Sequence, residues 1–404
     1  MNIPFSLPVI DQDVIDEMLD TLTNTGWLTS GPKVLALEHE IKKYTGTEAV
    51  VCVNSWTSGA MLMLRWFGVG PGDEVIIPAY TYSATALCVL NMGATPVMVD
   101  VLDDFTINPA LLEKAITSKT KVVIPVDIGG WPCDYKAINK IVNSSGARNK
   151  FSPSSPRQEK LGRILVIADA AHSIGAVVDG IQSGNFTDLT VFSFHSVKNI
   201  TTGEGGAICL NLPQPFNNVD EYKFLKALSL NGQTKSAYEK NQPGAWKYDI
   251  IAQGLKVNMP DICATIGLAQ IRKYKTVFLP ERKKIFDFYT NVLREYDWAV
   301  IPPYENNGKE SSYHLYLLRI NGITEEQRDR MIVHIGEAGV GVNVHYVPMA
   351  MLTLFKELGF KMEDYPVTFN LYQNQITLPV FNGLTVEQLQ RVTEAVVDAY
   401  NAVR

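Results

Sequence analysis

The fold is decided by the stretch Phe192-Ser-Phe-His-Ser-Val-Lys-Asn-Ile-Thr-Thr-Gly-Glu-Gly-Gly-Ala207. It places one lysine, Lys198, among hydroxyl-bearing residues, a histidine and glycines. The apolar runs Leu189–Phe194 before this segment and Gly206–Leu210 at its end are both typical of buried strands. The sequence therefore predicts that Lys198 lies in a loop between two strands.

An aspartate at the end of another predicted strand supplies a partner for this lysine. The apolar run Ile164–Ala168 leads directly into Asp169. A lysine of this kind holds the aldehyde of pyridoxal phosphate (PLP) as a Schiff base, and an aspartate keeps the pyridine nitrogen of that cofactor protonated. Taken singly, the two residues have simpler interpretations, as a solvated surface lysine and a helix-capping aspartate. The pair, together with the nearby glycines, favours a PLP enzyme.

Small hydroxyl residues mark a candidate phosphate site. The segment Asn54-Ser-Trp-Thr-Ser-Gly59 lies between a predicted strand and a predicted helix. The first turn of a helix offers unpaired N–H groups and the positive end of the helix dipole, which suit a phosphate dianion. Plain helix capping by Ser55 or Thr57 is the alternative. Ser193 is expected to add a hydroxyl to the same phosphate.

Two further side chains are candidates for contacts with the cofactor ring. Tyr82 follows a predicted strand and is expected to stack on the ring, with Tyr80 as the competing candidate and core packing as the alternative for both. His172, three residues after Asp169, is placed to reach the ring hydroxyl. On spacing alone, a histidine that only satisfies a nearby carbonyl group fits equally well.

The alternation of strands and helices defines the fold class. Strands are expected at residues 49–53, 74–78, 95–100, 121–127, 164–168, 190–194 and 206–210, and helices at 58–66 and 82–91. Such strand-helix-strand units indicate an α/β fold with a largely parallel sheet between helices. Ligands of these sheets bind at the carboxyl ends of the strands, where Asp169 falls.

The C-terminal third has a different pattern, with strands expected at 315–320 and 341–346 and helices at 281–296, 325–338 and 386–402. We therefore expect a large α/β domain over residues 1–250 and a smaller α+β domain over 251–404. The polar segment 144–160 has no hydrophobic period and is predicted to be an inserted surface loop.

Composition excludes several functional classes. A net charge of −6 over 404 residues provides no basic excess for nucleic acid or anionic membranes. No apolar run approaches the roughly 18 residues that span a bilayer, and no signal peptide is evident, so a cytoplasmic location is expected. The five cysteines and six histidines are scattered without metal-type spacing, so no metal site is expected.

At this point the motifs match a known family. The chain resembles the sugar-nucleotide aminotransferases of the DegT/DnrJ/StrS family, a branch of the PLP fold type I enzymes, over nearly its whole length. The resemblance rests on these segments: Gly26-Trp-Leu-Thr-Ser-Gly-Pro32, Asn54-Ser-Trp-Thr-Ser58, Pro71-Gly-Asp-Glu-Val75, Pro78-Ala-Tyr-Thr-Tyr82, Asp169-Ala-Ala-His172, Ser193-Phe-His-Ser-Val-Lys-Asn199, Gly203-Glu-Gly-Gly206 and Asn258-Met-Pro-Asp261. The combination of the lysine and aspartate motifs is highly specific, whereas the turn motifs are not. The resemblance implies a seven-stranded type of sheet in the large domain.

The resemblance also implies a role for each matching position. Lys198 and Asp169 are the catalytic pair, and further cofactor contacts are expected from His172, Thr57, Ser58, Tyr82, Ser193 and Asn258. In the family, the residue at the position of Asn258 reaches the phosphate bound by the neighbouring subunit, which implies a homodimer with shared active sites. The sugar-nucleotide end is associated with His314, His345 and Tyr346.

The implied reaction is transfer of an amino group from L-glutamate, which becomes 2-oxoglutarate, to a nucleotide-linked keto-deoxy sugar, at C4 by preference. Such a reaction serves amino-sugar or surface-polysaccharide biosynthesis. Family members that dehydrate a sugar carry histidine in place of the lysine, so Lys198 favours transamination. The alternatives are a PLP-dependent dehydratase and a regulatory protein that binds PLP or a sugar nucleotide without catalysis. The chain departs from the family pattern at Trp56, where a glycine is usual, and at Asp127 and Met349-Ala-Met351, where histidines are usual.

Overall fold

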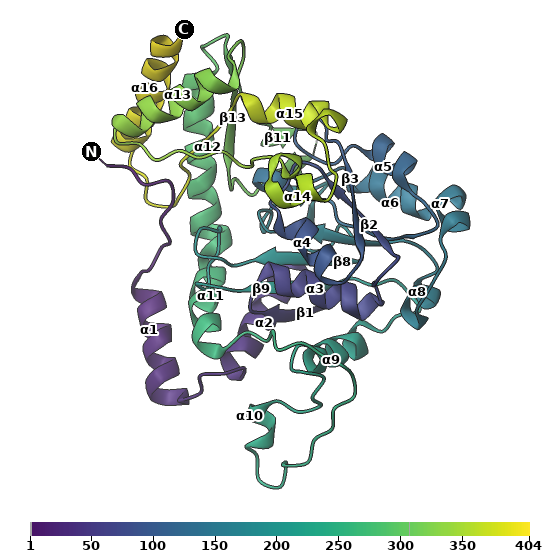
Figure 1. The fold of residues 1–404 in the computed structure, drawn as a ribbon. Coiled ribbons are helices and arrows are strands. Elements are labelled where there is room, and N and C mark those ends of the chain that lie inside the picture. Colours follow the sequence, from purple (N-terminus) through teal and green to yellow (C-terminus); the bar gives the residue numbers. More distant parts are fainter. Residues whose placement is uncertain (1, 307) are drawn as a thin grey trace.

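A seven-stranded sheet forms the centre of the larger part of the molecule in the computed structural model, which describes residues 2–306 and 308–404 (Figure 1). The order across the sheet is β1-β9-β8-β5-β4-β2-β3, and β9 runs antiparallel to both of its neighbours while the other pairs are parallel. The strands are β1 (Ala49–Val53), β2 (Glu74–Pro78), β3 (Thr95–Val99), β4 (Thr120–Val123), β5 (Leu165–Asp169), β8 (Leu189–Ser193) and β9 (Gly206–Leu210). The predicted α/β class with a mostly parallel sheet is confirmed.

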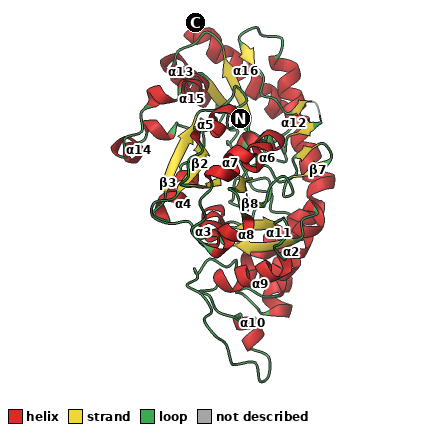
Figure 2. Ribbon diagram, turned by 90° about the vertical axis from the view of Figure 1, so that its right-hand side faces the viewer, coloured by secondary structure: helices red, strands yellow, loops and turns green. Residues whose placement is uncertain are grey.

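The strands are apolar because both faces of the sheet are covered. Successive residues of a strand point to opposite faces, and in β2 the side chains of Val75 and Ile77 join one core cluster while Ile76 joins another. Figure 2 shows the strands enclosed between helices. One face packs against α3 (Trp56–Phe67), α4 (Ala84–Asn91) and α9 (Asn218–Leu228). The other packs against α2 (Pro32–Thr45), α5 (Pro109–Ala115), α6 (Tyr135–Asn143) and α11 (Asp261–Lys273).

A smaller antiparallel sheet, β10-β13-β14, forms the core of the C-terminal part with three helices packed on it. These elements are β10 (Ala299–Val300), β13 (Tyr316–Ile320), β14 (Gln375–Leu378), α12 (Leu279–Leu293), α13 (Glu325–Glu337) and α16 (Val386–Val403). Two-residue strands form a third sheet that joins the two parts: β6 (Val177–Val178), β7 (Ile181–Gln182), β11 (Glu305–Asn306) and β12 (Lys309–Glu310). The remaining helices are α1 (Gln12–Asp20), α7 (Ser145–Lys150), α8 (Pro156–Leu161), α10 (Ala237–Lys240), α14 (Thr353–Glu357) and α15 (Pro366–Gln373).

Packing crosses the predicted border between residues 250 and 251 in both directions. The α11 residues Ala264 and Ile271 share a core with the α2 residue Leu37. Conversely, Ile3 packs in the core of the C-terminal part, where its backbone N–H donates to the Gly339 carbonyl over 2.8 Å. The division into 1–250 and 251–404 stays a prediction.

The prediction of a surface loop at 144–160 is wrong, because most of this segment forms the two short helices α7 and α8. Ser144 and Ser155 cap them by accepting hydrogen bonds from backbone N–H groups. The side chain of Gln158 is buried and donates to the carbonyl of Phe67 at the end of α3 over 3.1 Å. The segment is therefore packed against the body of the protein.

Two expected strands also differ from the structure. The strand expected at 121–127 ends at Val123, because Pro125 has no N–H to continue the ladder. The segment 341–346 does not form a strand, since only Asn343 pairs with β14, through Thr377. Within the described residues, we find no helix that combines the length and the apolar character needed to cross a membrane.

Candidate active site

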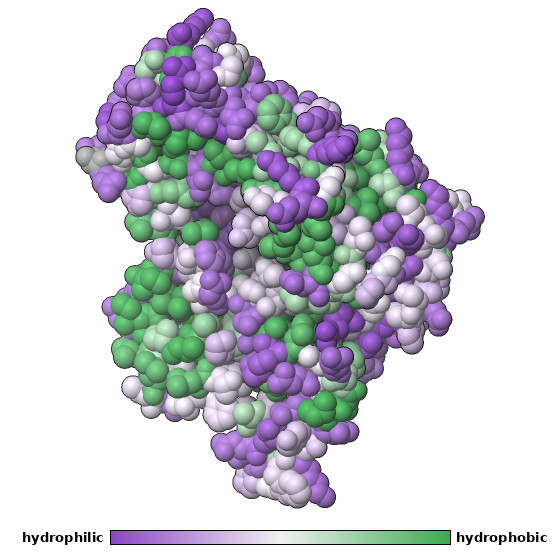
Figure 3. Space-filling view, in the orientation of Figure 1, coloured by the Kyte–Doolittle hydropathy of each residue, from purple (hydrophilic) through white to green (hydrophobic). Residues whose placement is uncertain are grey.

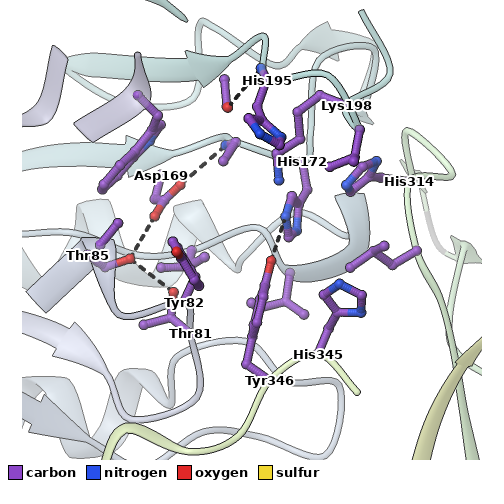
Figure 4. A pocket seen from close by; sticks show the side chains of 18 of the residues that line it. Thr81, Tyr82, Thr85, Asp169, His172, His195, Lys198, His314, His345 and Tyr346 are labelled. Carbon is purple, nitrogen blue, oxygen red and sulfur yellow. Dashed lines mark hydrogen bonds between the residues drawn. The ribbon is translucent and has the colours of Figure 1, made fainter. Parts of the chain in front are cut away.

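A cavity of about 320 Å³ lies where the carboxyl ends of the parallel strands meet the C-terminal part of the chain (Figure 4). Nine of the predicted site residues line it: Thr57, Tyr82, Asp169, His172, Ser193, Lys198, His314, His345 and Tyr346. Ser58 and Asn258 are not among the described residues that line it. The sequence-based candidates, distant in the chain, are thus mostly brought to one place.

Lys198 reaches this cavity from the loop between β8 and β9. A turn fixes the loop, because the Lys198 N–H donates to the carbonyl of His195 over 2.9 Å. Burial lowers the pKa of the Lys198 amine to about 8, although the nearby Asp169 raises it. About a fifth of this lysine is therefore neutral at a pH near 7.4, far more than for an ordinary lysine, and the neutral form is the one that acts as a nucleophile or a base.

Asp169 ends β5 and is almost fully buried. One carboxylate oxygen accepts a hydrogen bond from the Thr85 hydroxyl over 2.9 Å, and the other accepts from the Ala171 N–H over 3.2 Å. Burial raises the pKa of Asp169 to about 7, and these two hydrogen bonds act in the opposite direction. Burial makes the ionised form of this carboxyl group unfavourable, so a positively charged group beside it would stabilise that form.

The sequence analysis missed Thr85, which orients this carboxylate. Its hydroxyl is also 3.0 Å from that of Thr81, one helical turn earlier. Both are almost fully buried, Thr85 in the first turn of α4 and Thr81 in the segment just before it. The only signal in the sequence is the spacing of two threonines around Tyr82, which is too common to be informative.

His172 is buried near Lys198, and both of its ring nitrogens have hydrogen-bond partners. The Gly129 N–H donates to Nδ1 over 3.2 Å, and Nε2 lies 3.1 Å from the Tyr346 hydroxyl. Gly129 adopts a φ of 65°, a left-handed conformation that favours glycine. Burial is the main cause that holds the pKa of His172 well below its ordinary value, so the ring is neutral.

The first turn of α3, where the predicted phosphate contacts lie, forms one end of the cavity. The Ser55 hydroxyl caps the helix by accepting from the Ser58 N–H over 3.0 Å, and it also contacts the Ser58 hydroxyl over 2.9 Å. Thr57 and Ser193 line the cavity beside this turn. The cap predicted as an alternative is therefore present, and it coexists with a half-buried helix N-terminus at the cavity that suits an anion.

Two residues that depart from the family pattern, Trp56 and Asp127, lie in different surroundings. Trp56 packs in the core beneath α3 and also lines the cavity. Asp127 is fully buried and accepts hydrogen bonds from the Cys133 N–H, the Tyr135 hydroxyl and the Ser173 hydroxyl. Asp127 therefore braces the loop behind the cavity.

The far end of the cavity is built from the C-terminal part and the N-terminus. The Phe5 ring stacks on His345 at 5.3 Å between centroids, and both Phe5 and Ser6 line the cavity. Burial lowers the pKa of His345 to about 3. The sequence analysis missed these N-terminal residues because nothing in the sequence links residue 5 to residue 345.

Asn258 lies outside this cavity, next to the strand β1. Its side-chain amide donates to the Ser30 hydroxyl over 2.7 Å, and its carbonyl oxygen contacts the Lys256 amine. Its backbone pairs with that of Val53. Asn258 is therefore not placed to contact a phosphate bound in the cavity of its own chain.

The residues present fit PLP. The buried carboxyl group of Asp169 suits a protonated pyridine nitrogen, and the amine of Lys198, whose pKa is lowered by burial, suits the aldehyde. The N-terminus of α3 with its hydroxyl groups suits the phosphate, and the exposed ring of Tyr82 suits the face of the pyridine. Each chemical group of the cofactor thus has a matching partner.

The chain is similar to known aminotransferases over its whole length. The family model described as "DegT/DnrJ/EryC1/StrS aminotransferase family" matches residues 9–149 and 157–397, with its break inside the 144–160 segment. A solved structure of a putative sugar aminotransferase, Spr1654 from Streptococcus pneumoniae in its PMP form, is 42% identical with a TM-score of 0.95, and covers 100% of both chains. The PLP form of the same protein superimposes with a TM-score of 0.94 at 41% identity over 100% of both chains.

Two sequence relatives agree with this result. The spore coat polysaccharide biosynthesis protein SpsC of Bacillus subtilis is 33% identical, over 98% of this chain and 96% of its own length. The UDP-4-amino-4-deoxy-L-arabinose–oxoglutarate aminotransferase of Shewanella sediminis is 31% identical, over 98% of this chain and 97% of its own. The predicted fold type I and the predicted cofactor PLP are confirmed. The chain belongs to the DegT/DnrJ/EryC1/StrS family of PLP-dependent aminotransferases.

Proposed function

We propose that this aminotransferase moves the amino group of L-glutamate to the keto group, at C4, of a nucleotide-linked keto-deoxy sugar. The observation that carries the proposal is the pair Lys198 and Asp169 in one buried cavity. The sugar and the oxoglutarate are supported by the relatives, one of which is named as a putative sugar aminotransferase and another as a UDP-sugar–oxoglutarate aminotransferase. SpsC supports a place in polysaccharide or amino-sugar biosynthesis.

Each residue of the cavity has a defined task in this proposal. When bound, PLP supplies an electron-accepting ring that carries the amino group from one substrate to the other. The Lys198 amine, with its pKa lowered to about 8, binds the aldehyde, and once released it takes and returns the substrate proton. Asp169 holds the proton on the ring nitrogen. The phosphate would be held by Thr57 and Ser58 in the first turn of α3 and by Ser193 at the end of β8.

The ring and the substrates are oriented by the other residues. His172 would contact the ring hydroxyl, and Tyr82 would stack on the ring, since both side chains line the cavity. The sugar end is formed by His314, His345 and Tyr346.

We also propose a homodimer in which Asn258 of one subunit contacts the phosphate bound by the other. Asn258 lies outside the cavity of its own chain. This position supports the proposal, because a residue that contacts the phosphate of the other subunit would not line its own cavity. Exposed hydrophobic residues are numerous on two elements that such a contact would cover, and those over α1 are visible in Figure 3. They are Ile15, Leu19 and Leu22 at α1 and Trp246, Tyr248, Ile250 and Ile251 on the arm that carries α10. A cytoplasmic location goes with this proposal, because keto-sugar nucleotides and glutamate are cytoplasmic metabolites.

The experiment that tests the reaction is the visible absorption spectrum of the PLP-loaded enzyme during stepwise addition of substrates. L-Glutamate is expected to remove the band of the lysine-bound cofactor, and 2-oxoglutarate to restore it. A 4-keto-6-deoxy sugar linked to UDP or dTDP is then expected to restore the band and yield an amino sugar detectable by mass spectrometry.

The spectrum also separates the alternatives. Loss of water from the keto sugar, with no amino sugar formed, would identify a dehydratase. An absorption band of the lysine-bound cofactor that changes with neither glutamate nor keto sugars would support a regulatory binding protein and refute the proposal.

A further inference from the structure

Two histidine rings lie against each other in the cavity, with the centroids of His172 and His314 4.4 Å apart (Figure 4). A neutral imidazole carries its proton on one of two nitrogens, and this choice decides whether the other nitrogen accepts a hydrogen bond. In each ring, the partner of Nδ1 can act only as a donor or only as an acceptor. The position of the proton on the ring therefore follows from these contacts.

In His172 the proton is on Nε2. The partner of its Nδ1 is the backbone N–H of Gly129, which has no acceptor capacity. Nδ1 must therefore present its lone pair. The neutral ring then offers an N–H at Nε2, which faces the Tyr346 hydroxyl.

In His314 the proton is on Nδ1, and Asn199 determines this. The amide nitrogen of Asn199 lies 2.7 Å from the backbone carbonyl of Ser312, which only accepts hydrogen bonds. The same nitrogen donates to the Tyr274 hydroxyl over 3.0 Å, and that hydroxyl donates onward to the carbonyl of Ile174 over 2.7 Å.

The orientation of the amide is therefore fixed by two backbone carbonyls, and its oxygen is the atom that faces His314. This oxygen lies 2.8 Å from Nδ1 of the ring. Since an amide oxygen only accepts, Nδ1 must carry the proton, and Nε2 keeps its lone pair.

The surrounding charges keep the His314 ring neutral. The groups that act on it, after burial, are His172, Lys198, Arg282 and His345, and none of these described groups is a carboxylate. The Arg282 guanidinium donates to the carbonyls of Tyr313 and His314 over 3.0 Å each. Cationic or neutral neighbours disfavour a second proton on the imidazole, and the pKa of His314 lies well below its ordinary value.

We propose that Asn199 is a positioning residue that keeps His314 in the Nδ1-protonated form, so that Nε2 accepts a hydrogen bond from the molecule reacting at Lys198. The donor is an amino or hydroxyl hydrogen, which both substrates of an aminotransferase of this kind carry. His172 presents an N–H from the adjacent ring. Two uncharged side chains thus offer one donor and one acceptor side by side. The inference rests on the proposed function only in placing the reaction at Lys198.

The first test is NMR of the PLP-loaded enzyme with 13C-labelled histidine rings, because the Cδ2 chemical shift differs between the two tautomers. The chain has six histidines, and the signals of the two rings are assigned with the variants His172→Gln and His314→Gln. We expect opposite tautomers for His172 and His314 and no titration of either ring between about pH 6 and 9. The same tautomer in both rings would overturn the inference.

The second test is Asn199→Asp, which replaces the amide NH2 group by an oxygen at nearly constant shape, so that a carboxylate faces Nδ1 of His314 and the donor to the Ser312 carbonyl is lost. The new negative charge beside Nδ1 raises the pKa of His314, so its NMR signal begins to titrate in this range and the lone pair at Nε2 is lost as the pH falls. One half-reaction is then expected to slow about tenfold at low pH and to recover as the pH rises. The control Asn370→Asp adds the same charge at an exposed position of α15.

The two half-reactions are followed separately to identify the donor group. A loss confined to the glutamate step identifies an amino hydrogen, and a loss confined to the sugar step identifies a hydroxyl. An unchanged titration of His314 in Asn199→Asp refutes the positioning role. If this variant does not fold, the tautomers of the wild-type enzyme decide alone. Failure of the wild-type enzyme to react with glutamate or keto sugars refutes the proposed function but leaves the tautomer result intact.

Discussion

At the scale of single residues, Lys198 is the group whose loss is expected to be most severe. Lys198→Ala removes both the amine that binds the aldehyde and the base that moves the substrate proton, so turnover is expected to fall at least about 10³-fold. The variant still binds PLP through Asp169 and the start of α3, as equilibrium dialysis will show. Lys198→Arg, which keeps the positive charge, serves as the control and is expected to be equally inactive. Normal turnover in either variant would contradict the assignment.

Asp169 and Thr85 give a prediction about pH. The Thr85 hydroxyl stabilises the ionised form of Asp169, so Thr85→Val raises a pKa that burial has already raised to about 7. Since the ionised carboxylate is the form that pairs with a protonated ring, activity is lost as the pH falls through the pKa of Asp169, and this loss moves to higher pH in the variant. A hydrogen bond to a charged group implies a decrease in kcat/KM of about tenfold near neutral pH, shrinking as the pH rises.

A pH-rate profile of Thr85→Val measures this shift. Asp169→Asn is the companion variant, because it binds PLP but transaminates poorly at every pH. A Thr85→Val profile that coincides with that of the wild-type enzyme would show that the hydroxyl does not tune the carboxylate.

At the scale of elements, the backbones of β9 and of the first turn of α3 pack closely against each other beside the cavity. A Cβ atom on Gly206 would lie 2.7 Å from the carbonyl oxygen of Phe192 and 2.9 Å from the carbonyl carbon of Ser55. Both are backbone atoms, so either β9 or the start of α3 must move. Gly206→Ala is expected to cost about 1–3 kcal/mol of folding free energy and to weaken PLP binding.

The matched control is Gly70→Ala, because a Cβ atom on Gly70 has no neighbour within 4 Å. Thermal unfolding of both variants, with and without PLP, separates loss of stability from loss of cofactor binding. Equal midpoints for the two variants would show that the junction tolerates the added methyl group.

The elements also show what the sequence allows one to predict. The strands ending at Asp169 and before Lys198 were predictable because buried strands are continuous apolar runs with a chemical group at the end. The small sheet formed by β6, β7, β11 and β12 was not, because two-residue strands have no periodicity. The segment 144–160 was misjudged because its helices are capped by serines and anchored by a buried polar residue, Gln158.

The same division holds for the site. The residues predicted to perform covalent or ionic chemistry are visible in the sequence, because Asp169 ends a strand and Lys198 lies in the loop after one. Residues that orient them, such as Thr85, Gly129 and Asn199, act through contacts that only the folded chain creates. Their residue types are common in loops and turns, so no spacing distinguishes them.

At the scale of the whole molecule, the proposed homodimer predicts a particle of twice the chain mass of 44.8 kDa. Sedimentation equilibrium at low protein concentration measures this directly. A mass of one chain would exclude an active site shared between subunits.

Mixing two inactive variants tests the shared site itself. Lys198→Ala carries its lesion in its own cavity, whereas Asn258→Ala is proposed to damage the cavity of the partner. In a hybrid dimer one cavity then carries both lesions and the other carries none. Random exchange of subunits by a symmetric dimer is expected to restore about a quarter of the wild-type sites. The assay uses a PLP concentration at which Asn258→Ala alone is not loaded. If Asn258 serves the cavity of its own chain, every cavity of the hybrid carries one lesion and no activity returns.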